Sequence, residues 1–556
     1  MTTTIIDKID EQKLRGGYYT PRPIADFICR WAITNPTQRV LEPSCGDGIF
    51  LESAIDIFLK LGVPRNKLFG ALKGIELVKE EADKSRSRMA NYALNSTTIL
   101  NSDFFEYISK GNGDTHYDVV IGNPPFIRYQ NFPEHHRERA IKMMQAMGLH
   151  PNKLTNIWVP FLLISASILN KHGKLGMVIP AELFQVKYAA ETRVFLANFF
   201  SRITVVTFRK LVFNDIQQEV ILLLCEKDVA KNKGIRFVEI SNLEELNNLN
   251  IAKIQKAEVK SLDHSSEKWT KYFLQEKEIQ LLRKIKSDSR IKRCRDVMEV
   301  DVGIVTGMND FFMLNKETVK KWKLKPYVRK VVSRSSHFKG IVFDDADFET
   351  NSVAQYAGYL FLPPQKDFHA LPKVCQDYIA YGEEQNYHIG YKCRIRKNWY
   401  ITPSIWVPDA FVLRQVADYP KLIVNKTDAS STDTIHRARL TTKIKPETIA
   451  LSFLNSLTLA FSEITGRSYG GGVLTFEPTE IEEIPLPILN TAKIDIKLID
   501  SLIRERKIDQ VLDIVDQELL IKQLKFSKAE VQELRNIWKK LSNRRNNRKV
   551  QASKNN

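Results

Sequence analysis

The stretch YDVVIGNPPFIRYQ, residues 117–130, decides how the amino-terminal half of this chain folds. Residues 119–121 form an apolar, β-branched run typical of an interior strand, and Gly122 marks its end. The Asn-Pro-Pro-Phe segment, residues 123–126, is therefore a loop that follows a buried strand. Its two prolines fix φ and remove two backbone donors, which holds the loop extended and leaves the Asn123 side chain free to face a ligand. A rigid turn is the plain alternative for an isolated Asn-Pro-Pro.

The flanking sequence alternates short apolar runs with helix-length amphipathic segments from about residue 38 to 225, as βαβ units do. Strands are expected at residues 39–43, 69–77, 96–103, 117–122, 175–180, 202–208 and 219–226. Helices are expected at residues 49–62, 78–95 and 157–173, and the last should end at Gly173. The pattern predicts an α/β fold class with an open, mostly parallel, Rossmann-like sheet covered by helices on both faces. Ligands of such sheets bind at the carboxyl ends of the strands.

The predicted strand ends carry a consistent set of residues. The first strand runs into Glu42-Pro-Ser-Cys45-Gly46-Asp47-Gly48, a turn of small residues that allows a ligand to approach the backbone. Glu76 ends the second strand, Asp103 and Phe104 follow the third, and Asn123 follows the fourth. An acid about thirty residues beyond a glycine turn is well placed to bind ribose hydroxyls. Taken singly, Glu76 is also consistent with a surface acid and Asp103 with a helix cap.

The glycine turn also limits the kind of ligand. It does not have the G-x-G-x-x-G spacing, and it lacks the Lys-Ser/Thr pair of a phosphate-binding loop. The predicted ligand is therefore nucleoside-like and carries no polyphosphate.

The net charge of +18 is concentrated towards the carboxyl terminus. Residues 521–556 contain eleven Lys or Arg and two Glu, and residues 321–339 contain seven Lys or Arg and no acid. Trp322, Tyr327 and Phe338 lie within the second segment, and basic residues interleaved with aromatic ones indicate a polyanionic partner. A solvated, lysine-rich face is the alternative. The residues proposed to bind this polyanion are Lys321, Lys323, Lys325, Arg329, Lys330 and Arg334.

The composition places further bounds on the protein. A chain of 556 residues exceeds one ordinary core, so two or more domains are expected. No stretch reaches the roughly 18 consecutive apolar residues of a membrane span, and the amino terminus does not resemble a signal peptide, so a cytoplasmic bacterial protein without membrane contact is expected. The six cysteines are scattered without a Cys-x-x-Cys pair, so neither a metal site nor a disulfide framework is predicted.

In this order, the motifs of residues 14–226 resemble those of the γ-class DNA adenine-N6 methyltransferases, which use S-adenosyl-L-methionine. The resemblance implies that residues 123–126 (Asn123, Pro124, Pro125 and Phe126) are catalytic, with Phe126 at a position where Tyr is commoner. Phe126 and Phe213 would stack on the target base. The residues that it implies for cofactor binding are Tyr19, Thr20, Glu42, Cys45, Gly46, Glu76, Leu77, Asp103, Phe104 and Asn123.

The carboxyl-terminal half resembles a TaqI-like specificity domain at two places. Residues 302–315 are similar to its opening, and residues 466–487, which include a triple glycine at 470–472, are similar to its close. The domains expected from these observations are a catalytic domain at 1–230, a connecting segment at 231–290, an α+β target-recognition domain at 291–490, and carboxyl-terminal helices with a basic tail at 491–556.

The resemblance implies a function. The protein is expected to be the modification enzyme of a Type II restriction-modification system, which methylates the N6 amino group of a flipped-out adenine in double-stranded DNA. A separately encoded restriction endonuclease is an expected partner. Cytosine-N4, RNA or protein glutamine are alternative acceptors, although the cytosine enzymes usually carry Ser at position 123. A bifunctional restriction enzyme is disfavoured, since Asp344, Asp345 and Asp347 are not followed by Glu-x-Lys. A non-catalytic DNA-binding protein is disfavoured by the intact Glu76, Asp103 and Asn123.

Overall fold

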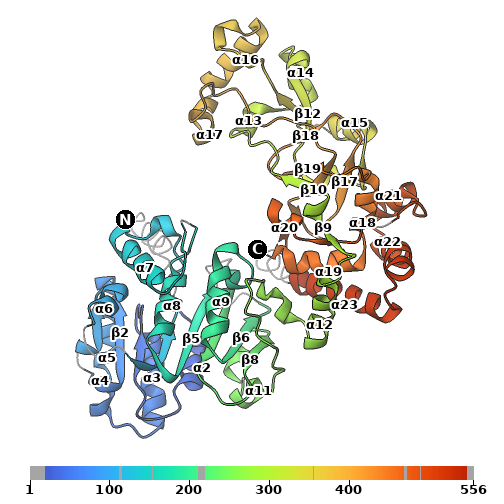
Figure 1. The fold of residues 1–556 in the computed structure, drawn as a ribbon. Helices are drawn as coiled ribbons and strands as arrows, with labels where there is room; N and C mark the ends of the chain where they lie inside the picture. The colour runs from blue at the N-terminus through green and yellow to red at the C-terminus, as the bar shows by residue number, and fades with distance from the viewer. Residues whose placement is uncertain are drawn as a thin grey trace. The chain divides into compact units, whose positions relative to one another are not determined.

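The computed structural model describes residues 19–94, 96–111, 116–152, 154–210, 219–354, 356–468, 472–488 and 490–547. These residues divide into two compact units (Figure 1). Unit 1 contains the described residues up to Ile279, and unit 2 contains those from Gln280 onwards. Phe213 and two residues of the triple glycine, Gly470 and Gly471, lie outside the described residues.

Unit 1 is built on a sheet whose eight described strands follow the order β3-β2-β1-β4-β5-β7-β6-β8. The strands are β1 (Val40–Glu42), β2 (Leu72–Glu76), β3 (Ile99–Asn101), β4 (Tyr117–Gly122), β5 (Leu169–Pro180), β6 (Arg202–Phe208), β7 (Val220–Glu226) and β8 (Gly234–Ile240). All neighbouring pairs are parallel except those of β7, which runs antiparallel to both β5 and β6. The predicted open, mostly parallel sheet is therefore confirmed, and each of the seven predicted strands is present.

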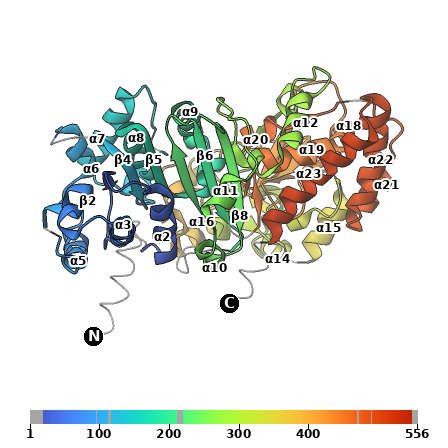
Figure 2. The same cartoon turned by 90° about the horizontal axis from the view of Figure 1, so that it is seen from below.

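Helices cover both faces of this sheet (Figure 2). One face carries α2 (Arg22–Ala32), α3 (Ile49–Lys60), α5 (Lys79–Ala90), α10 (Leu243–Asn247) and α11 (Ile251–Gln255). The other carries α6 (Phe104–Ser109), α7 (Glu134–Ala146), α8 (Trp158–Ser167) and α9 (Ala190–Phe199). Because both faces are covered, the central strands are buried throughout and appear in the sequence as continuous apolar runs.

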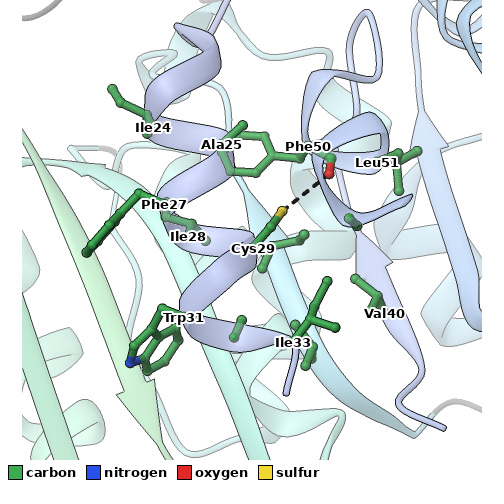
Figure 3. Close-up of a cluster of buried hydrophobic side chains, with 14 of the residues drawn as sticks. Ile24, Ala25, Phe27, Ile28, Cys29, Trp31, Ile33, Val40, Phe50 and Leu51 are labelled. Carbon is green, nitrogen blue, oxygen red and sulfur yellow. Dashed lines mark hydrogen bonds between the residues drawn. The ribbon is translucent and has the colours of Figure 1, made fainter. Parts of the chain in front are cut away.

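The packing of α2 shows how the first face is held (Figure 3). Its apolar side chains, among them Ile24, Phe27 and Ile28, are fully buried against the sheet and α3. The Cys29 thiol donates a hydrogen bond to the Phe50 carbonyl oxygen at 3.4 Å. All six cysteines are buried, and none forms a disulfide.

The helix predicted to end at Gly173 is shorter than expected, and this prediction was wrong. α8 ends at Ser167, and β5 begins at Leu169. Tyr117 of β4 pairs with Leu169, whereas Val119 pairs with Lys174, so β5 contains a bulge between these pairs. A Cβ on Gly173 would lie 2.9 Å from the Leu169 Cβ, so the glycine serves a tight bulge rather than a helix end.

The expected connecting segment at residues 231–290 also differs from the structure. β8 pairs with β6 along its whole length, from Arg202 with Gly234 to Phe208 with Ile240. The compact unit therefore extends beyond residue 230, as far as Ile279. α12 (Glu276–Lys286) contains the point of the sequence at which the units divide.

Unit 2 combines several small sheets with helices, which is the α+β arrangement expected for this half. Its five-stranded sheet consists of β10 (Met298–Asp301), β19 (Ile435–Leu440), β15 (Ala410–Leu413), β17 (Leu422–Asn425) and β13 (Val342–Phe343). Its four-stranded sheet consists of β11 (Met313–Leu314), β14 (Tyr359–Phe361), β12 (Val328–Val332) and β18 (Ser430–Ser431). Two smaller sheets pair β16 (Gln415–Val416), β21 (Leu474–Thr475) and β20 (Arg467–Ser468), and β22 (Pro485–Leu486) with β9 (Lys292–Arg293).

The carboxyl-terminal helices are part of unit 2 and do not form a separate domain. α23 (Lys528–Asn547) packs against α19 (Ser456–Thr465), and the buried Arg545 guanidinium donates to the buried Glu463 carboxylate at 2.9 Å. The other helices of unit 2 are α13 (Asn309–Phe312), α14 (Lys316–Lys321), α15 (Asp345–Val353), α16 (Lys373–Glu384), α17 (Tyr391–Arg394), α18 (Pro446–Phe453), α20 (Pro478–Glu482), α21 (Ile496–Arg504) and α22 (Ile508–Val515).

Among the described residues, no single helix is both long and apolar enough to cross a membrane. α18 and α19 reach that length and composition only as a pair that bends by 77°, and their apolar side chains are buried within unit 2.

The packing of unit 1 predicts a large difference between two phenylalanines. Phe50 on α3 is 1% exposed, whereas Phe69 is 59% exposed. Phe50→Ala should lower the free energy of unfolding of unit 1 by about 3–5 kcal/mol, because it leaves a cavity between α2, α3 and the sheet. Phe69→Ala, the matched control, should change it by less than about 0.5 kcal/mol. Thermal and urea unfolding measure both; equal effects would contradict this core.

Candidate functional site

The carboxyl ends of β1, β2 and β4 bring together most of the residues singled out by sequence. The Gly46 N–H donates to the Glu76 carboxylate at 2.9 Å, which joins the turn after β1 to the end of β2. The Asn123 side-chain amide donates to the Thr20 hydroxyl at 3.1 Å, which joins the loop after β4 to the segment that precedes α2. The Ser44 hydroxyl lies 3.4 Å from the Asn123 carbonyl oxygen. The three strand ends therefore form one connected site.

The glycine turn places two glycines in the left-handed region for different reasons. Gly46 has a φ of +49°, and a Cβ built there would meet no atom within 4 Å, so the space above its backbone is open. Gly48 has a φ of +85°, and its Cβ would lie 2.5 Å from the Ser85 hydroxyl oxygen. Gly46 thus leaves room for a ligand, whereas Gly48 allows α5 to pack closely.

Two arginines outside the motif hold the turn in place. The Arg88 guanidinium on α5 donates to the Asp47 carbonyl at 2.8 Å, to the Asp47 carboxylate at 2.6 Å and to the Glu52 carboxylate at 2.7 Å. The Arg22 guanidinium on α2 donates to the same Glu52 at 2.7 Å and to Asp56 at 2.5 Å. This network joins α2, α3 and α5 around the turn. No local sequence signal marks it, since Arg22 and Arg88 are far apart in the chain.

Glu76 is buried and is held by backbone donors. Its carboxylate accepts hydrogen bonds from the N–H groups of Gly46 and Val78, the latter at 2.8 Å. Burial raises the pKa of Glu76 above its ordinary value, and these two backbone bonds partly oppose that shift. Leu77, the next residue, is 38% exposed and places an apolar side chain beside the acid. An acid beside an exposed apolar side chain suits the ribose and base of a nucleoside.

Glu42 is a second acid at the site, and it is 1% exposed. Burial raises its pKa well above the usual range, and the negative charges of Asp47 and Glu76 raise it further. Gly122 has a φ of +151°, and a Cβ there would lie 3.4 Å from the Glu42 Cγ. The glycine before Asn123 is therefore required by backbone conformation and lies directly against Glu42.

The Asn-Pro-Pro-Phe loop is anchored at both ends. Pro124 is buried, and the half-buried Phe126 ring packs against the core of unit 1. Just beyond it, the Ile127 carbonyl accepts a hydrogen bond from the Ile157 N–H at 3.0 Å. The loop is therefore stiffened by its prolines and by its contacts with the core.

Comparison with known proteins identifies the family. Residues 5–297, more than half of the chain, match the N-6 DNA Methylase family, and residues 266–520 match the C-terminal domain of the Type II methyltransferase M.Eco57I. The chain belongs to the N-6 DNA methylase family. It is 22% identical over 491 residues to the Type II methyltransferase M.AccI of Acinetobacter calcoaceticus, a match that covers 85% of this chain and 86% of that protein. The protein is a DNA adenine methyltransferase.

A further relative and one solved structure are also similar to this chain. The Type II methyltransferase M.HindII of Haemophilus influenzae is 23% identical over 353 residues, which are 59% of this chain and 60% of that protein. The fold resembles that of DrdV in its complex with DNA, solved by electron cryomicroscopy, with a TM-score of 0.53 and 14% identity over 89% of this chain and 57% of that one.

The residues after β3 of the methylase are engaged within the protein. One Asp103 carboxylate oxygen accepts from the Phe105 N–H at 2.9 Å and so caps α6, as in the helix-cap alternative. The other oxygen lies 2.6 Å from the His136 Nδ1 and accepts from Arg139 at 2.8 Å. The Phe104 ring is 2% exposed and stacks on Phe161, so it faces the core and does not offer a surface to a ligand.

Tyr19 and Cys45 occupy the edge and the floor of the site. The half-exposed Tyr19 hydroxyl lies 3.1 Å from the Glu81 carboxylate oxygens and accepts from the Lys84 ammonium at 2.8 Å, both on α5. Cys45 is buried, and its N–H donates to the Ile75 carbonyl at 2.9 Å. The position of Cys45 thus fixes the turn to β2.

The basic residues of the 321–339 segment differ in exposure and in their partners. Lys321, Lys323 and Lys325 are exposed, and so is Arg334, whereas Arg329 is half-buried. Lys330 forms ion pairs with Asp345 at 2.7 Å and Asp428 at 3.2 Å.

The aromatic residues of the same segment are half-buried or buried. Trp322 packs on Tyr378 and Tyr381, and Phe338 is buried against Phe343. Phe338 therefore belongs to the core, and the interpretation of the segment as a mixed basic and aromatic surface was wrong for this residue. Trp322 and Tyr327 are half-buried, and the Lys321 ammonium lies over the Trp322 ring, 6.0 Å from its centroid.

Proposed function

We propose that this methylase modifies specific sites in double-stranded DNA as part of a Type II restriction-modification system. It would use S-adenosyl-L-methionine and the Asn123 loop, as a γ-class enzyme with a TaqI-like recognition domain. The observation that carries the proposal is the connection of Asn123 to Thr20 at the edge of a turn whose Gly46 is tied to Glu76. A separately encoded restriction endonuclease would act on the same sites.

The residues at the site fit the proposed cofactor. The open space above Gly46 admits a ligand close to the backbone, and Glu76 would accept hydrogen bonds from the ribose hydroxyls. Leu77 would pack against the adenine, Asp103 would accept from the adenine amino group, and Thr20 with the buried Glu42 would face the methionine part. An ionised carboxylate accepts about four hydrogen bonds, so the contacts of Asp103 with Phe105, His136 and Arg139 leave it capacity for one more. When bound, S-adenosyl-L-methionine supplies an activated sulfonium methyl group.

Asn123 and Pro124 would prepare the adenine nitrogen for transfer. That nitrogen is a poor nucleophile because its lone pair is delocalised into the ring. The Asn123 side-chain oxygen and the Pro124 carbonyl oxygen would each accept one amino hydrogen, which favours a pyramidal nitrogen. Because the amide nitrogen of Asn123 donates to Thr20, its oxygen is directed away from Thr20. The anchored loop needs no reorganisation during the reaction, and its remaining task is to align the nitrogen with the methyl group.

An adenine inside a duplex cannot reach this loop, so the base must leave the stack. Phe126, with Phe213 as a second aromatic, would hold the flipped base, at about 1–3 kcal/mol for each stacked ring. The proton released by the amino group would leave to water.

The first experiment identifies the methylated base. Purified protein is incubated with unmethylated plasmid DNA and S-adenosyl-L-methionine, and the DNA is digested to nucleosides for mass spectrometry. We expect N6-methyladenine at a defined set of sites, which sequencing of the modified plasmid would locate. Methylated cytosine would show that the target base is cytosine, and the proposed catalytic site would stand. Methylation of RNA or of protein glutamine, without methylated DNA, would contradict the proposal.

Asn123→Ala should abolish methyl transfer and leave cofactor binding almost unchanged. The substitution removes an acceptor that acts on the amino group in the transition state, so kcat should fall by at least about 100-fold. Single-turnover methylation and calorimetric titration with S-adenosyl-L-methionine separate the two effects. Asn91→Ala, which changes an exposed amide at the end of α5, is the matched control and should retain full activity. Loss of cofactor affinity with Asn123→Ala would contradict the role given to this loop.

Glu76→Gln should weaken cofactor binding and change its pH dependence. The loss of charged hydrogen bonds to the ribose should cost about 1.5–3 kcal/mol, which is roughly a 10- to 150-fold rise in the dissociation constant. A protonated carboxyl has lost an acceptor, so the wild-type affinity should fall as the pH decreases through the raised pKa of Glu76. Titrations across acidic pH measure this. The loss of the Glu76 charge also lowers the pKa of Glu42 in the variant, so any pH dependence that remains should move to lower pH. An unchanged pH profile would remove Glu76 from the ribose contact, and Glu80→Gln, at an exposed position, is the control.

A further inference from the structure

A second surface of unit 2 combines exposed apolar side chains with positive charge. Between Glu384 and Asp409 the sequence contains no acidic residue. Within this interval, α17 (Tyr391–Arg394) and its flanks form the surface that we call the 389–397 surface (Figure 1). Its exposed residues are Ile389, Tyr391, Lys392, Arg394, Ile395 and Lys397.

The exposure of its apolar side chains is unusual for a folded segment. Ile389, Tyr391 and Ile395 are 61%, 65% and 59% exposed, although Cys393 between them is fully buried in a hydrophobic core of unit 2. The chain is therefore anchored, and the three large side chains project from a fixed backbone. A cluster of this kind indicates a binding surface more often than a lone exposed residue does.

A neighbouring loop, residues 302–307, is fixed against the same surface. The Arg396 guanidinium donates to the Val305 carbonyl at 2.8 Å, and the Arg437 guanidinium donates to the Val302 carbonyl at 2.9 Å. A Cβ on Gly307 would lie 2.7 Å from the Lys392 Cβ, which places this loop directly beside α17. Val305 is itself exposed, so it extends the apolar part of the surface.

The close packing of this loop explains its glycines. A Cβ on Gly303 would lie 1.9 Å from the Thr432 carbonyl oxygen, which leaves no room for any side chain. Gly307 has a φ of +83°. The loop and α17 are therefore held in one geometry by glycine packing and by two arginines, and the surface is preorganised.

We propose that the 389–397 surface is the part of unit 2 that contacts the bases of the DNA substrate. Lys392, Arg394 and Lys397 bind phosphates, and Tyr391 and Ile395 contact the bases. The proposal rests on DNA as the substrate, which the family membership establishes. Aromatic and aliphatic side chains flanked by cations are the chemistry with which proteins enter a groove or stack on a base.

The charges of this surface are available for phosphates. The Lys397 ammonium lies 4.0 Å from the Asp367 carboxylate, but both side chains are highly exposed, so solvent screens that pair. By contrast, Lys330 in the 321–339 segment is paired with two acids, Phe338 of that segment is buried, and its Trp322 and Tyr327 are half-buried. The 389–397 surface therefore presents an exposed aromatic side chain together with positive charge, whereas the aromatic side chains of the other segment are half-buried or buried.

Two variants of the full-length protein test the proposal. The first neutralises the cations, with Lys392→Ala, Arg394→Ala and Lys397→Ala combined, and the second removes the apolar contacts, with Tyr391→Ala and Ile395→Ala combined. The controls are the triple variant of Lys321, Lys323 and Lys325 and the double variant Val353→Ala with Leu498→Ala, which shortens exposed apolar side chains elsewhere in unit 2. Equilibrium binding is measured against a duplex that carries a methylation site and one that does not, over a range of salt concentrations.

The two variants should affect DNA binding in different ways. The cation variant should bind both duplexes about 10- to 100-fold more weakly and should lower the slope of log K against log salt by about 2–3, since each phosphate contact contributes about 0.9. The apolar variant should keep the salt slope and lose at least about tenfold of its preference for the duplex with the site. Both should retain the thermal stability and the cofactor affinity of the wild type, which shows that they fold.

Three results would overturn the proposal. The first is that both variants bind DNA with the affinity and the salt slope of the wild type. The second is that the triple control variant of Lys321, Lys323 and Lys325 weakens binding as much as the cation variant does, while the apolar variant binds like the wild type. The third is competition by polyglutamate as effective as that by duplex DNA, which would mark a site for acidic proteins. Binding does not require methyl transfer, so failure of the methylation experiment with retained, salt-dependent DNA binding would reject the catalytic proposal and not this one.

Discussion

The hydrogen bond from the Gly46 amide to the Glu76 carboxylate is the contact on which the site depends. It requires a left-handed residue in the turn after β1, and it requires β1 and β2 to be parallel neighbours in the register that pairs Glu42 with Gly74. The same turn is held from the other side by Arg88, whose guanidinium reaches both Asp47 and Glu52. The geometry of the ligand-facing turn is thus set by the sheet register and by the arginine network that joins α2, α3 and α5.

A second consequence of this arrangement is the electrostatic character of the site. Glu42 and Glu76 are buried close together, and burial raises the pKa of each. Two buried acids are costly without compensation, and a ligand that brings positive charge or hydroxyl donors stabilises their ionised forms. S-adenosyl-L-methionine has a sulfonium, an ammonium and two ribose hydroxyls. The acids would therefore favour the proposed charged cofactor over a neutral nucleoside, and they would repel a polyphosphate, in agreement with a glycine turn that lacks the Lys-Ser/Thr pair of a phosphate-binding loop.

The fold of unit 1 was largely predictable, because strands buried on both faces are continuous apolar runs and their order along the chain follows from βαβ connections. The missed strand, β8, lies at the sheet edge, and its GIRFVEI sequence is less uniformly apolar. At the site, Glu76, Asn123 and Thr20 were predictable from motifs, and the structure brings them together. Arg88, Arg22 and His136 were not, because their partners are distant in sequence. Phe338 shows the converse limit: composition reveals a basic and aromatic segment, but only packing reveals that this ring is buried.

The two units use the same physical solution, each within itself. In unit 1, prolines and core contacts fix the Asn-Pro-Pro-Phe loop before any substrate binds. In unit 2, Gly303, Arg396 and Arg437 fix the loop beside α17, although no proline is involved. In both places the conformational entropy of a loop is lost during folding and not during binding, so more of the interaction energy with DNA remains for discrimination. An enzyme that must hold one adenine in line with a methyl group, at one kind of site among many, gains most from rigidity at these two places.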